Sequence, residues 1–335
     1  MALDKCFRIH GKNEKCEICG KCKCFCSCIR CPICSNRFAY NVVCNRCYFC
    51  IECCKCPNVT FFKNNLRFYK STAKQRMINK SQRFIAAEIE VASISKKGGK
   101  EIMDMVKKWN GNIVRDSSLP ESGFEINTSP ANGDIFINQV NEICDVLNKG
   151  EATICNDCGT HIHIDARDYN YFDIEKLLKI YSRVEPMLFE MVPKSRRKAD
   201  HCKPTTDRYM SVIKNNNQSF KELKHNIVNS LYGEPSTMLR YERRNNVNQR
   251  RFAMNIHSFL YRGTIECRLL NGSINAEEIV KWGRLWLYIV DFGLNVNMDK
   301  LDIISSMPDY EAMINVINND QEIKNFIDER REKWK

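Results

Sequence analysis

Apolar and polar positions alternate in three short segments of the chain after residue 82. The first is residues 84–92 (FIAAEIEVA), and the same period of two recurs from Gly159 to Asp165 and from Gly263 to Leu270. Such alternation predicts β-strands that bury one face and leave the other face polar. Between and after these strands, apolar residues recur every three to four positions, which predicts amphipathic helices.

The helices are expected at four places along the chain: Lys100 to Trp109, closed by Asn110-Gly111; residues 134–149; Ala276 to Phe292; and the end of the chain. Strands and helices therefore do not alternate strictly. This order favours an α+β fold around a largely antiparallel sheet. The length of 335 residues suits one large domain plus a small one.

The polar faces of the three predicted strands carry ionisable side chains. Residues i and i+2 of a strand point to the same side, which groups Glu88 with Glu90, His161 with His163 and Asp165, and Glu266 with Arg268. A merely solvated face would show the same alternation, but Thr, Ser or Lys would serve it as well. The Gly-flanked segment from Asp116 to Pro130 adds Glu125. Carboxylates with an imidazole form an oxygen-rich site suited to Mg²⁺ or Mn²⁺.

The first 60 residues differ in character, because 15 of the 20 cysteines lie between Cys6 and Cys56. Two cysteines separated by two residues can bind one zinc ion from a tight turn. Four such pairs can be drawn: Cys16 with Cys19, Cys31 with Cys34, Cys44 with Cys47, and Cys50 with Cys53. So short a segment buries little core, so we expect about two to four structural Zn²⁺ ions to stabilise a module over residues 1–60. A disulfide knot and an iron–sulfur cluster are the alternatives, and residues 36–40 could form a short hairpin.

The net charge of +12 lies entirely in residues 1–80, which hold 16 Lys/Arg and 4 Asp/Glu. A basic segment can bind nucleic acid or another polyanion, but zinc-bound thiolates would cancel part of this excess. The partner of the cysteine module, whether protein or nucleic acid, therefore stays open. Residues 61–82 are predicted to be a basic linker whose aromatic residues either dock the module on its neighbour or stack on bases.

Membrane association is not expected, because no apolar run reaches the roughly 18 residues that a membrane span needs. The charged N-terminus, MALDKCFRIHGK, has no apolar signal segment. We therefore expect a cytoplasmic protein. In a reducing compartment, dense cysteines are metal ligands more often than disulfides.

Four motifs, in their order along the chain, resemble the amidoligase family, which is related to glutamine synthetase and the glutamate–cysteine ligases. They are AAEIEVA, GFEINTSP, CGTHIHID and TIECRLL followed by a long helix. The resemblance covers about residues 83–300, and we assign residues 83–335 to an amidoligase-like catalytic domain with the antiparallel sheet of those ligases. Two positions depart from the family pattern: Ala86 replaces a glycine, and Thr160 replaces a bulky aliphatic residue.

The resemblance implies an ATP-dependent ligase that activates a carboxylate as an acyl phosphate and joins it to an amine. It implies two metal sites, one on the substrate side with Glu90 and Glu125, and one bridging the ATP phosphates with Glu88, His161 and Glu266. It further implies that Arg268 binds the transferred phosphate and that His163 lies against nucleotide or substrate. The catalytic candidates are therefore Arg268, His163 and Glu125.

Two arginine-rich stretches, Lys194 to Lys203 and Arg240 to Arg251, are either solvated surface or contributors to an anion site. We select Arg251 as the candidate for ATP. The pair Cys155 and Cys158 looks like half a zinc site, but no partner pair lies nearby, so a structural role is expected. Two other functions stay open: an inactive ligase fold that binds partners through the zinc module, and a hydrolase or transferase with the same metal site.

Overall fold

The computed structural model describes residues 29–30, 37–38, 83–215, 218–232 and 250–335. The linker over residues 61–82 lies outside these ranges, as does most of the stretch from Arg240 to Arg251. Strand β2 (Arg37–Phe38) falls within the expected hairpin of residues 36–40. It pairs antiparallel with β1 (Ile29–Arg30), so its partner strand lies outside residues 36–40 rather than within that short segment.

The cysteines that we assign to zinc also lie outside the described residues. They are Cys16, Cys19, Cys31, Cys34, Cys44, Cys47, Cys50 and Cys53. The zinc-binding module over residues 1–60 and the pairing of its cysteines therefore remain predictions from the sequence.

A six-stranded sheet of order β4-β5-β3-β6-β8-β7 forms the centre of the described structure. Its strands are β3 (Ile85–Val91), β4 (Asn112–Val114), β5 (Phe124–Asn127), β6 (Thr160–Asp165), β7 (Met254–Asn255) and β8 (Thr264–Cys267). Every neighbouring pair is antiparallel. The mixed helical and antiparallel fold expected from the sequence is thereby confirmed. The short strands β4, β5 and β7 were not predicted as strands.

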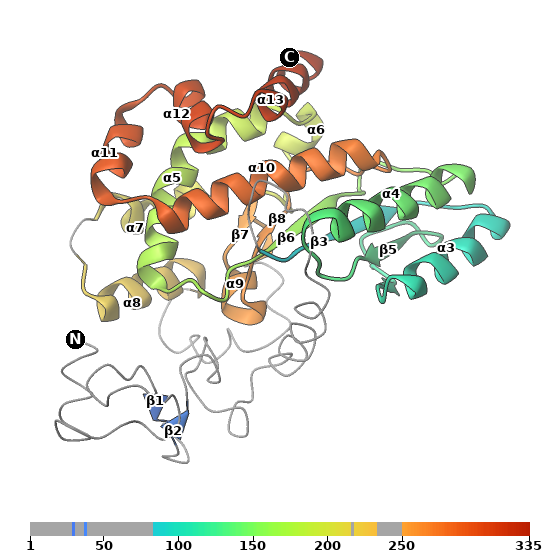
Figure 1. Cartoon of the computed structure of the whole chain (residues 1–335), viewed down its shortest axis with the longest axis horizontal. Coiled ribbons are helices and arrows are strands. Elements are labelled where there is room, and N and C mark those ends of the chain that lie inside the picture. Colours follow the sequence, from blue (N-terminus) through green and yellow to red (C-terminus); the bar gives the residue numbers. More distant parts are fainter. Residues whose placement is uncertain (1–28, 31–36, 39–82, 216–217, 233–249) are drawn as a thin grey trace.

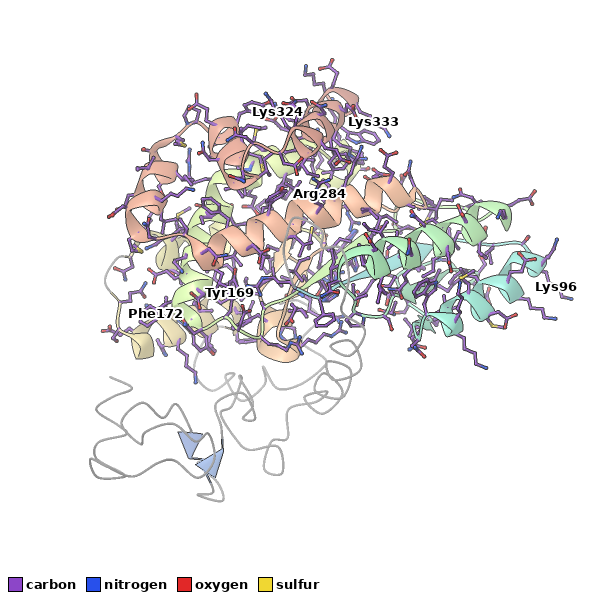
Figure 2. All side chains as sticks on the ribbon, in the orientation of Figure 1. Lys96, Tyr169, Phe172, Arg284, Lys324 and Lys333 are labelled. Atoms are coloured by element: carbon purple, nitrogen blue, oxygen red, sulfur yellow. The ribbon has the colours of Figure 1, made fainter. Side chains whose placement is uncertain are left out.

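The helices flank this sheet and extend beyond it (Figure 1). They are α3 (Lys96–Lys108), α4 (Gly133–Lys149), α5 (Tyr171–Glu190), α6 (Lys194–Arg197), α7 (Met210–Lys214), α8 (Phe220–Tyr232), α9 (His257–Arg262), α10 (Ala276–Asn295), α11 (Met298–Ser306), α12 (Asp309–Val316) and α13 (Gln321–Lys333), with a 3-10 turn at Thr206–Tyr209. Lys96 and Lys333 lie on the outer helices (Figure 2). Among the described residues, no helix has the length and apolarity of a membrane span.

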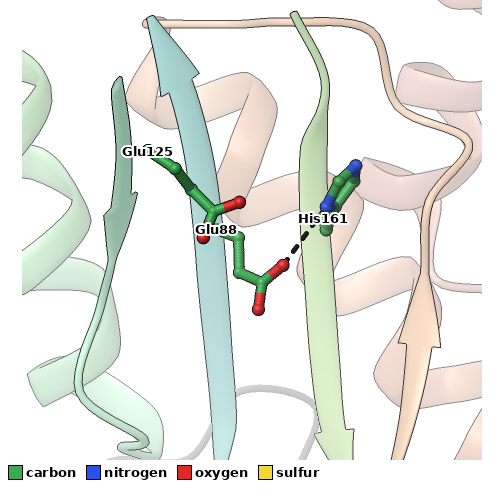
Figure 3. Close-up of side chains that lie close together, drawn as sticks. All are labelled: Glu88, Glu125 and His161. Atoms are coloured by element: carbon green, nitrogen blue, oxygen red, sulfur yellow. Dashed lines mark hydrogen bonds and ion pairs between the residues drawn. The ribbon is translucent and has the colours of Figure 1, made fainter. Parts of the chain in front are cut away.

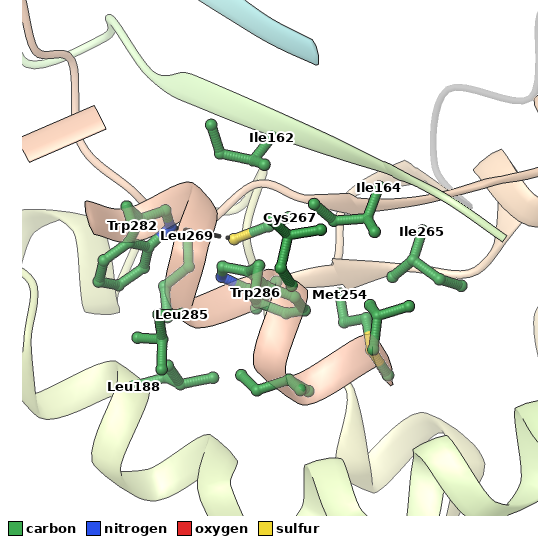
Figure 4. Packing of buried hydrophobic residues seen from close by; sticks show 14 of the residues in the cluster. Ile162, Ile164, Leu188, Met254, Ile265, Cys267, Leu269, Trp282, Leu285 and Trp286 are labelled. Atoms are coloured by element: carbon green, nitrogen blue, oxygen red, sulfur yellow. Dashed lines mark hydrogen bonds between the residues drawn. The ribbon is translucent and has the colours of Figure 1, made fainter. Parts of the chain in front are cut away.

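The apolar face of the sheet packs against α10. Two tryptophans of the helix, Trp282 and Trp286, lie against apolar side chains of the sheet (Figure 4). These side chains are Ile162, Ile164, Ile265 and Cys267, and all six residues are fully buried. A Cβ atom added at Gly283 would lie 2.7 Å from Cδ1 of Ile85, so the helix approaches the sheet closely at this glycine. Because this face of the sheet is buried, the ionisable side chains of the same strands lie on the opposite, polar face.

Local signals explain where the principal helices begin and end. Asn275 caps α10 by accepting a hydrogen bond from the backbone N–H of Glu278. Asn170 and Asp173 form a reciprocal capping box at the start of α5. Helix α9 ends at Gly263, whose φ of 76° lies in the left-handed region that favours glycine. This turn leads directly into β8, one of the strands that carry the candidate site.

Candidate functional site

The polar face of the sheet gathers ionisable side chains from four adjacent strands. Strand register fixes this arrangement, because Glu90 pairs with Glu125, Glu88 with His161, and His163 with Glu266. Directly opposed side chains on antiparallel strands lie within contact distance of one another. Figure 3 shows Glu88, Glu125 and His161 converging from β3, β5 and β6.

Short distances connect Glu88 to both histidines of the CGTHIHID motif. Oε2 of Glu88 lies 3.3 Å from Nδ1 of His161, and Oε1 lies 3.1 Å from Nε2 of His163. His161 also approaches Glu90, with 3.7 Å between Nε2 and Oε1, and Glu266, with 3.9 Å between Nδ1 and Oε1. The structure thus brings the implied metal ligands together on one face.

Three groups of ligand atoms on this face are close enough to share a metal ion, with all atoms of a group within 4.8 Å of one another: Glu88, Glu125 and His161; Glu88, His163 and Glu266; and Glu90, Asp116 and Glu125. The group that contains Glu90 and Glu125 agrees with the metal site expected on the substrate side. The metal site expected at the ATP phosphates differs in one residue, because His163 rather than His161 groups with Glu88 and Glu266. Asp116 is an additional candidate ligand.

Asp116 was not predicted as a metal ligand because it lies outside the predicted strands. It follows β4 in the connection to β5, and only the fold brings it near Glu90. Its carboxylate also forms a local turn, accepting hydrogen bonds from the backbone N–H and the hydroxyl of Ser118 at 2.8 Å each. The signal that could have identified it is the DSS sequence, in which an aspartate organises a tight turn beside a carboxylate-rich segment.

The chemistry of these groups fits divalent cations. Carboxylates, the ligands that Mg²⁺ and Mn²⁺ prefer, form the majority in each of the three groups. Nε2 of His163 is buried and has no aligned hydrogen-bond partner within the described part of the chain, although Oε1 of Glu88 lies 3.1 Å away. Glu90, Glu125 and Glu266 are buried as well, and buried carboxylates are stable only when they are paired or bind metals.

Crowding of negative charge perturbs Glu125 strongly. Burial, together with the neighbouring Glu88, raises the pKa of Glu125 to about 8, and Glu90 and Asp116 add to this rise. A hydrogen bond at 2.7 Å from Asn127 opposes it. A carboxyl group kept neutral by burial and by neighbouring negative charges is typical of a site that binds a cation.

The pKa values of Glu88 and Glu266 are shifted in the opposite direction. Burial would raise the pKa of Glu88, but His163, His161 and Arg262 together lower it well below its usual value. Burial likewise opposes ionisation of Glu266, yet Arg268 and His163 lower its pKa to about 2. These two carboxylates are therefore charged acceptors at neutral pH.

Arg268 lies beside the group formed by Glu88, His163 and Glu266. Its Nη1 donates to Oε1 of Glu266 at 2.5 Å, and its Nε donates to the backbone carbonyl of His201 at 3.3 Å. The buried Arg196 fixes the backbone here by donating to the carbonyl oxygens of Arg268 and Leu269. The stretch from Lys194 to Lys203 thus holds Arg268 in place through Arg196 and His201.

A pocket of about 110 Å³ adjoins these groups and contains three arginines. It is lined by Glu88, Arg250, Asn255, His257, Ser258, Arg262, Glu266 and Arg268. Arg251, the candidate chosen from sequence, is exposed and does not line this pocket, whereas its neighbour Arg250 does. Arg262 and Asn255 were also missed, because α9 and β7 are too short to show a periodic pattern.

The remaining motif residues serve the structure of the site. The backbone N–H of Gly159 donates to Oε2 of Glu90 at 2.5 Å. The Sγ atoms of Cys155 and Cys158 lie 3.5 Å apart without a disulfide, and Cys158 packs against apolar neighbours. Asp165, at the end of β6, pairs with Arg167 and does not belong to the three ligand groups.

Comparison with known families agrees with this geometry. The chain matches the model of a family described as "Putative amidoligase enzyme" over residues 68–290. The match covers more than half of the chain and includes all seven residues of the three ligand groups. The chain therefore belongs to the amidoligase family, which confirms the family resemblance of its four motifs.

Two solved structures resemble the fold at low similarity. A bifunctional glutathione synthetase from Pasteurella multocida is 13% identical with a TM-score of 0.40, and the match covers 82% of this chain and 49% of that one. This chain thus spans about half the length of that protein. A structure described as a novel glutamine synthase homolog is 9% identical with a TM-score of 0.33, covering 81% and 67% of the two chains. The sequence matches none of the curated proteins compared with it.

Proposed function

We propose that this chain is an ATP-dependent carboxylate–amine ligase that uses Mg²⁺ or Mn²⁺ and forms amide or peptide bonds through an acyl phosphate. The observation that best supports this proposal is the gathering of five carboxylates and two histidines beside Arg268 on one sheet face. Family membership supports the same class of reaction. The carboxylate and the amine are the two substrates, and ATP is the third.

The residue types suit this chemistry. A carboxylate is a poor electrophile, so transfer of a phosphoryl group to it supplies a leaving group for the amine. The transfer crowds negative oxygens, whose charge divalent cations would neutralise. The cation beside the ATP phosphates would be held by Glu88, His161, His163 and Glu266. The cation beside the substrate would be held by Glu90, Glu125 and Asp116. Arg268 would bind the moving phosphoryl group through its planar guanidinium.

Nucleotide turnover tests this proposal directly. The protein is incubated with ATP, Mg²⁺ and pooled amino acids or peptides, and the products are separated. ADP and inorganic phosphate that depend on the acceptor pool are expected, together with a new amide product. Formation of AMP and pyrophosphate instead would indicate that the carboxylate is activated as an acyl adenylate rather than as an acyl phosphate. ATP hydrolysis without any amide product would favour a hydrolase.

A binding protein with an inactive ligase fold is the alternative from another class. It would recognise a protein or nucleic acid through the cysteine module and would need no metal in the sheet. Buried carboxylates lower the stability of a fold unless a cation compensates them. Retaining several of them on one face therefore favours a working metal site. Absence of ATP binding in the presence of Mg²⁺ would support the binding protein instead.

We further propose that residues 1–60 bind zinc and recruit a peptide or protein substrate to the ligase. Native mass spectrometry of the full chain should show a mass excess equivalent to about two to four Zn²⁺ ions, with the cysteines reduced. Chelation at neutral pH should remove this mass. Intact disulfides, or a chain without zinc after expression in zinc-supplemented medium, would rule out the module.

A further inference from the structure

Arg262 lies at the end of α9, and its guanidinium contacts the central carboxylate of the site. Its Nη1 donates to Oε1 of Glu88 at 3.0 Å. Glu88 belongs to two of the three groups that could hold a metal ion. Arg262 therefore pairs with one carboxylate oxygen of a residue that could hold a divalent cation.

Both carboxylates of the group around His163 are paired with an arginine. Glu88 pairs with Arg262 and Glu266 pairs with Arg268, and both arginines line the same pocket. In the absence of metal, each guanidinium supplies part of the positive charge that the carboxylates require. A divalent cation bound between these carboxylates would repel both guanidinium groups.

The two arginines differ in exposure and in their place in the fold. The side chain of Arg268 is 17% exposed, and Arg268 directly follows strand β8 of the sheet. The side chain of Arg262 is 33% exposed and belongs to the last residue of a six-residue helix. Gly263 follows it in the left-handed conformation and ends the helix. Arg262 is therefore the arginine that can change partners with less disturbance of the sheet.

We propose that Arg262 and the divalent cation are alternative partners of Glu88, and that Arg262, once displaced, binds phosphate oxygens of the metal-bound nucleotide in the adjoining pocket. This inference rests on the proposed function for its nucleotide half. Arg262 then serves two purposes in turn. It neutralises Glu88 while the site is empty, and it contributes donors to the phosphates when the site is loaded. The exchange makes binding of metal and binding of nucleotide mutually reinforcing.

Substitution of Arg262 distinguishes the proposed exchange of partners from a purely structural role of Arg262. In Arg262→Gln, Glu88 loses a competitor for the cation, so Mn²⁺ should bind the nucleotide-free protein about two- to fivefold more tightly, the effect of losing a partly exposed ion pair. The affinity for a non-hydrolysable ATP analogue with Mn²⁺ should fall about tenfold, because a charged phosphate contact is lost. If Arg262 only positioned Glu88 for the metal, both affinities would fall together.

Mn²⁺ affinity is measured by electron paramagnetic resonance of free Mn²⁺, and analogue affinity by calorimetry at saturating Mn²⁺. Arg183→Gln is a matched control, because Arg183 is 31% exposed and pairs with Asp309 at 2.8 Å on α12. It should leave both affinities unchanged. Arg262→Lys retains the charge, so it should bind Mn²⁺ as the wild type does.

The outcomes separate this inference from the ligase function. Unchanged or weaker Mn²⁺ binding by Arg262→Gln would overturn the exchange, even in an active enzyme. A wild-type protein that binds Mn²⁺ but no nucleotide would overturn the proposed function and the nucleotide half of the inference. Opposite shifts of the two affinities, with both wild type and Arg183→Gln binding nucleotide, would support it.

Discussion

Glu125→Gln is expected to stabilise the metal-free protein at alkaline pH while reducing its ATP-dependent turnover by about 10²-fold or more. The pKa of Glu125 is raised to about 8 by burial and by Glu88, Glu90 and Asp116. A neutral amide of the same shape removes the charge that these neighbours oppose. It also removes a ligand from two of the three candidate metal groups.

The sign of the pH dependence follows from the raised pKa. In the unfolded chain, Glu125 ionises near its ordinary value of about 4.5, whereas in the folded protein it ionises near 8. Its contribution to wild-type stability is therefore fully present below pH 4.5 and is lost as the pH rises through 8. Each pKa unit corresponds to about 1.4 kcal/mol. After allowance for relaxation, we expect the variant to gain on the order of 3 kcal/mol over the wild type at pH 9 and little at pH 4.5.

Denaturant unfolding in the presence of a chelator at pH 5, 7 and 9 measures this difference. Glu101→Gln is a suitable control, because Glu101 is exposed on α3 and lies 3.9 Å from Lys97. It should show no gain that grows with pH. Adding Mg²⁺ should stabilise the wild type more than the Glu125 variant. A stability difference that stays constant between pH 5 and 9 would contradict the electrostatic origin of the raised pKa.

The strands that carry most of the site could be predicted from the sequence because their side-chain period is two. Alternation around Glu88, His161 and Glu266 determined which residues share a face, and antiparallel register then brought them together. Residues outside long periodic segments could not be placed in this way. Asp116 follows a three-residue strand, and Asn255 lies in a two-residue strand, so neither has a pattern to reveal it.

The sequence also led to Arg251 rather than Arg250 as the pocket arginine, because no periodic pattern covers these residues. Both belong to one basic stretch, and nothing in its composition decides which side chain faces the site. The pocket includes Arg250, whose Nε is buried without a hydrogen-bond partner in the described part of the chain. Helix α5 was not predicted either, although Asn170 and Asp173 have the spacing of a capping box and mark its start.

Arg268→Lys is expected to lower turnover by about 10²-fold or more, in line with the loss of one preorganised transition-state contact. The guanidinium of Arg268 is held on both sides, by Oε1 of Glu266 and by the carbonyl of His201. This fixed position allows its planar fork to bind two oxygen atoms of a phosphoryl group at once. Lysine retains the positive charge but has no fork, so it cannot reproduce that geometry.

The effect should fall on turnover rather than on nucleotide binding, because the retained charge still attracts ATP in the ground state. ADP formation and ATP affinity by calorimetry are compared for wild type, Arg268→Lys and Arg284→Lys. Arg284 on α10 also pairs with acidic side chains, Asp320 and Glu322, but does not line the pocket, so its variant controls for loss of an arginine ion pair (Figure 2). Near-normal ADP formation by Arg268→Lys would exclude Arg268 from phosphoryl transfer. The binding-protein alternative would then gain support, because the arginine beside Glu266 would have no catalytic role.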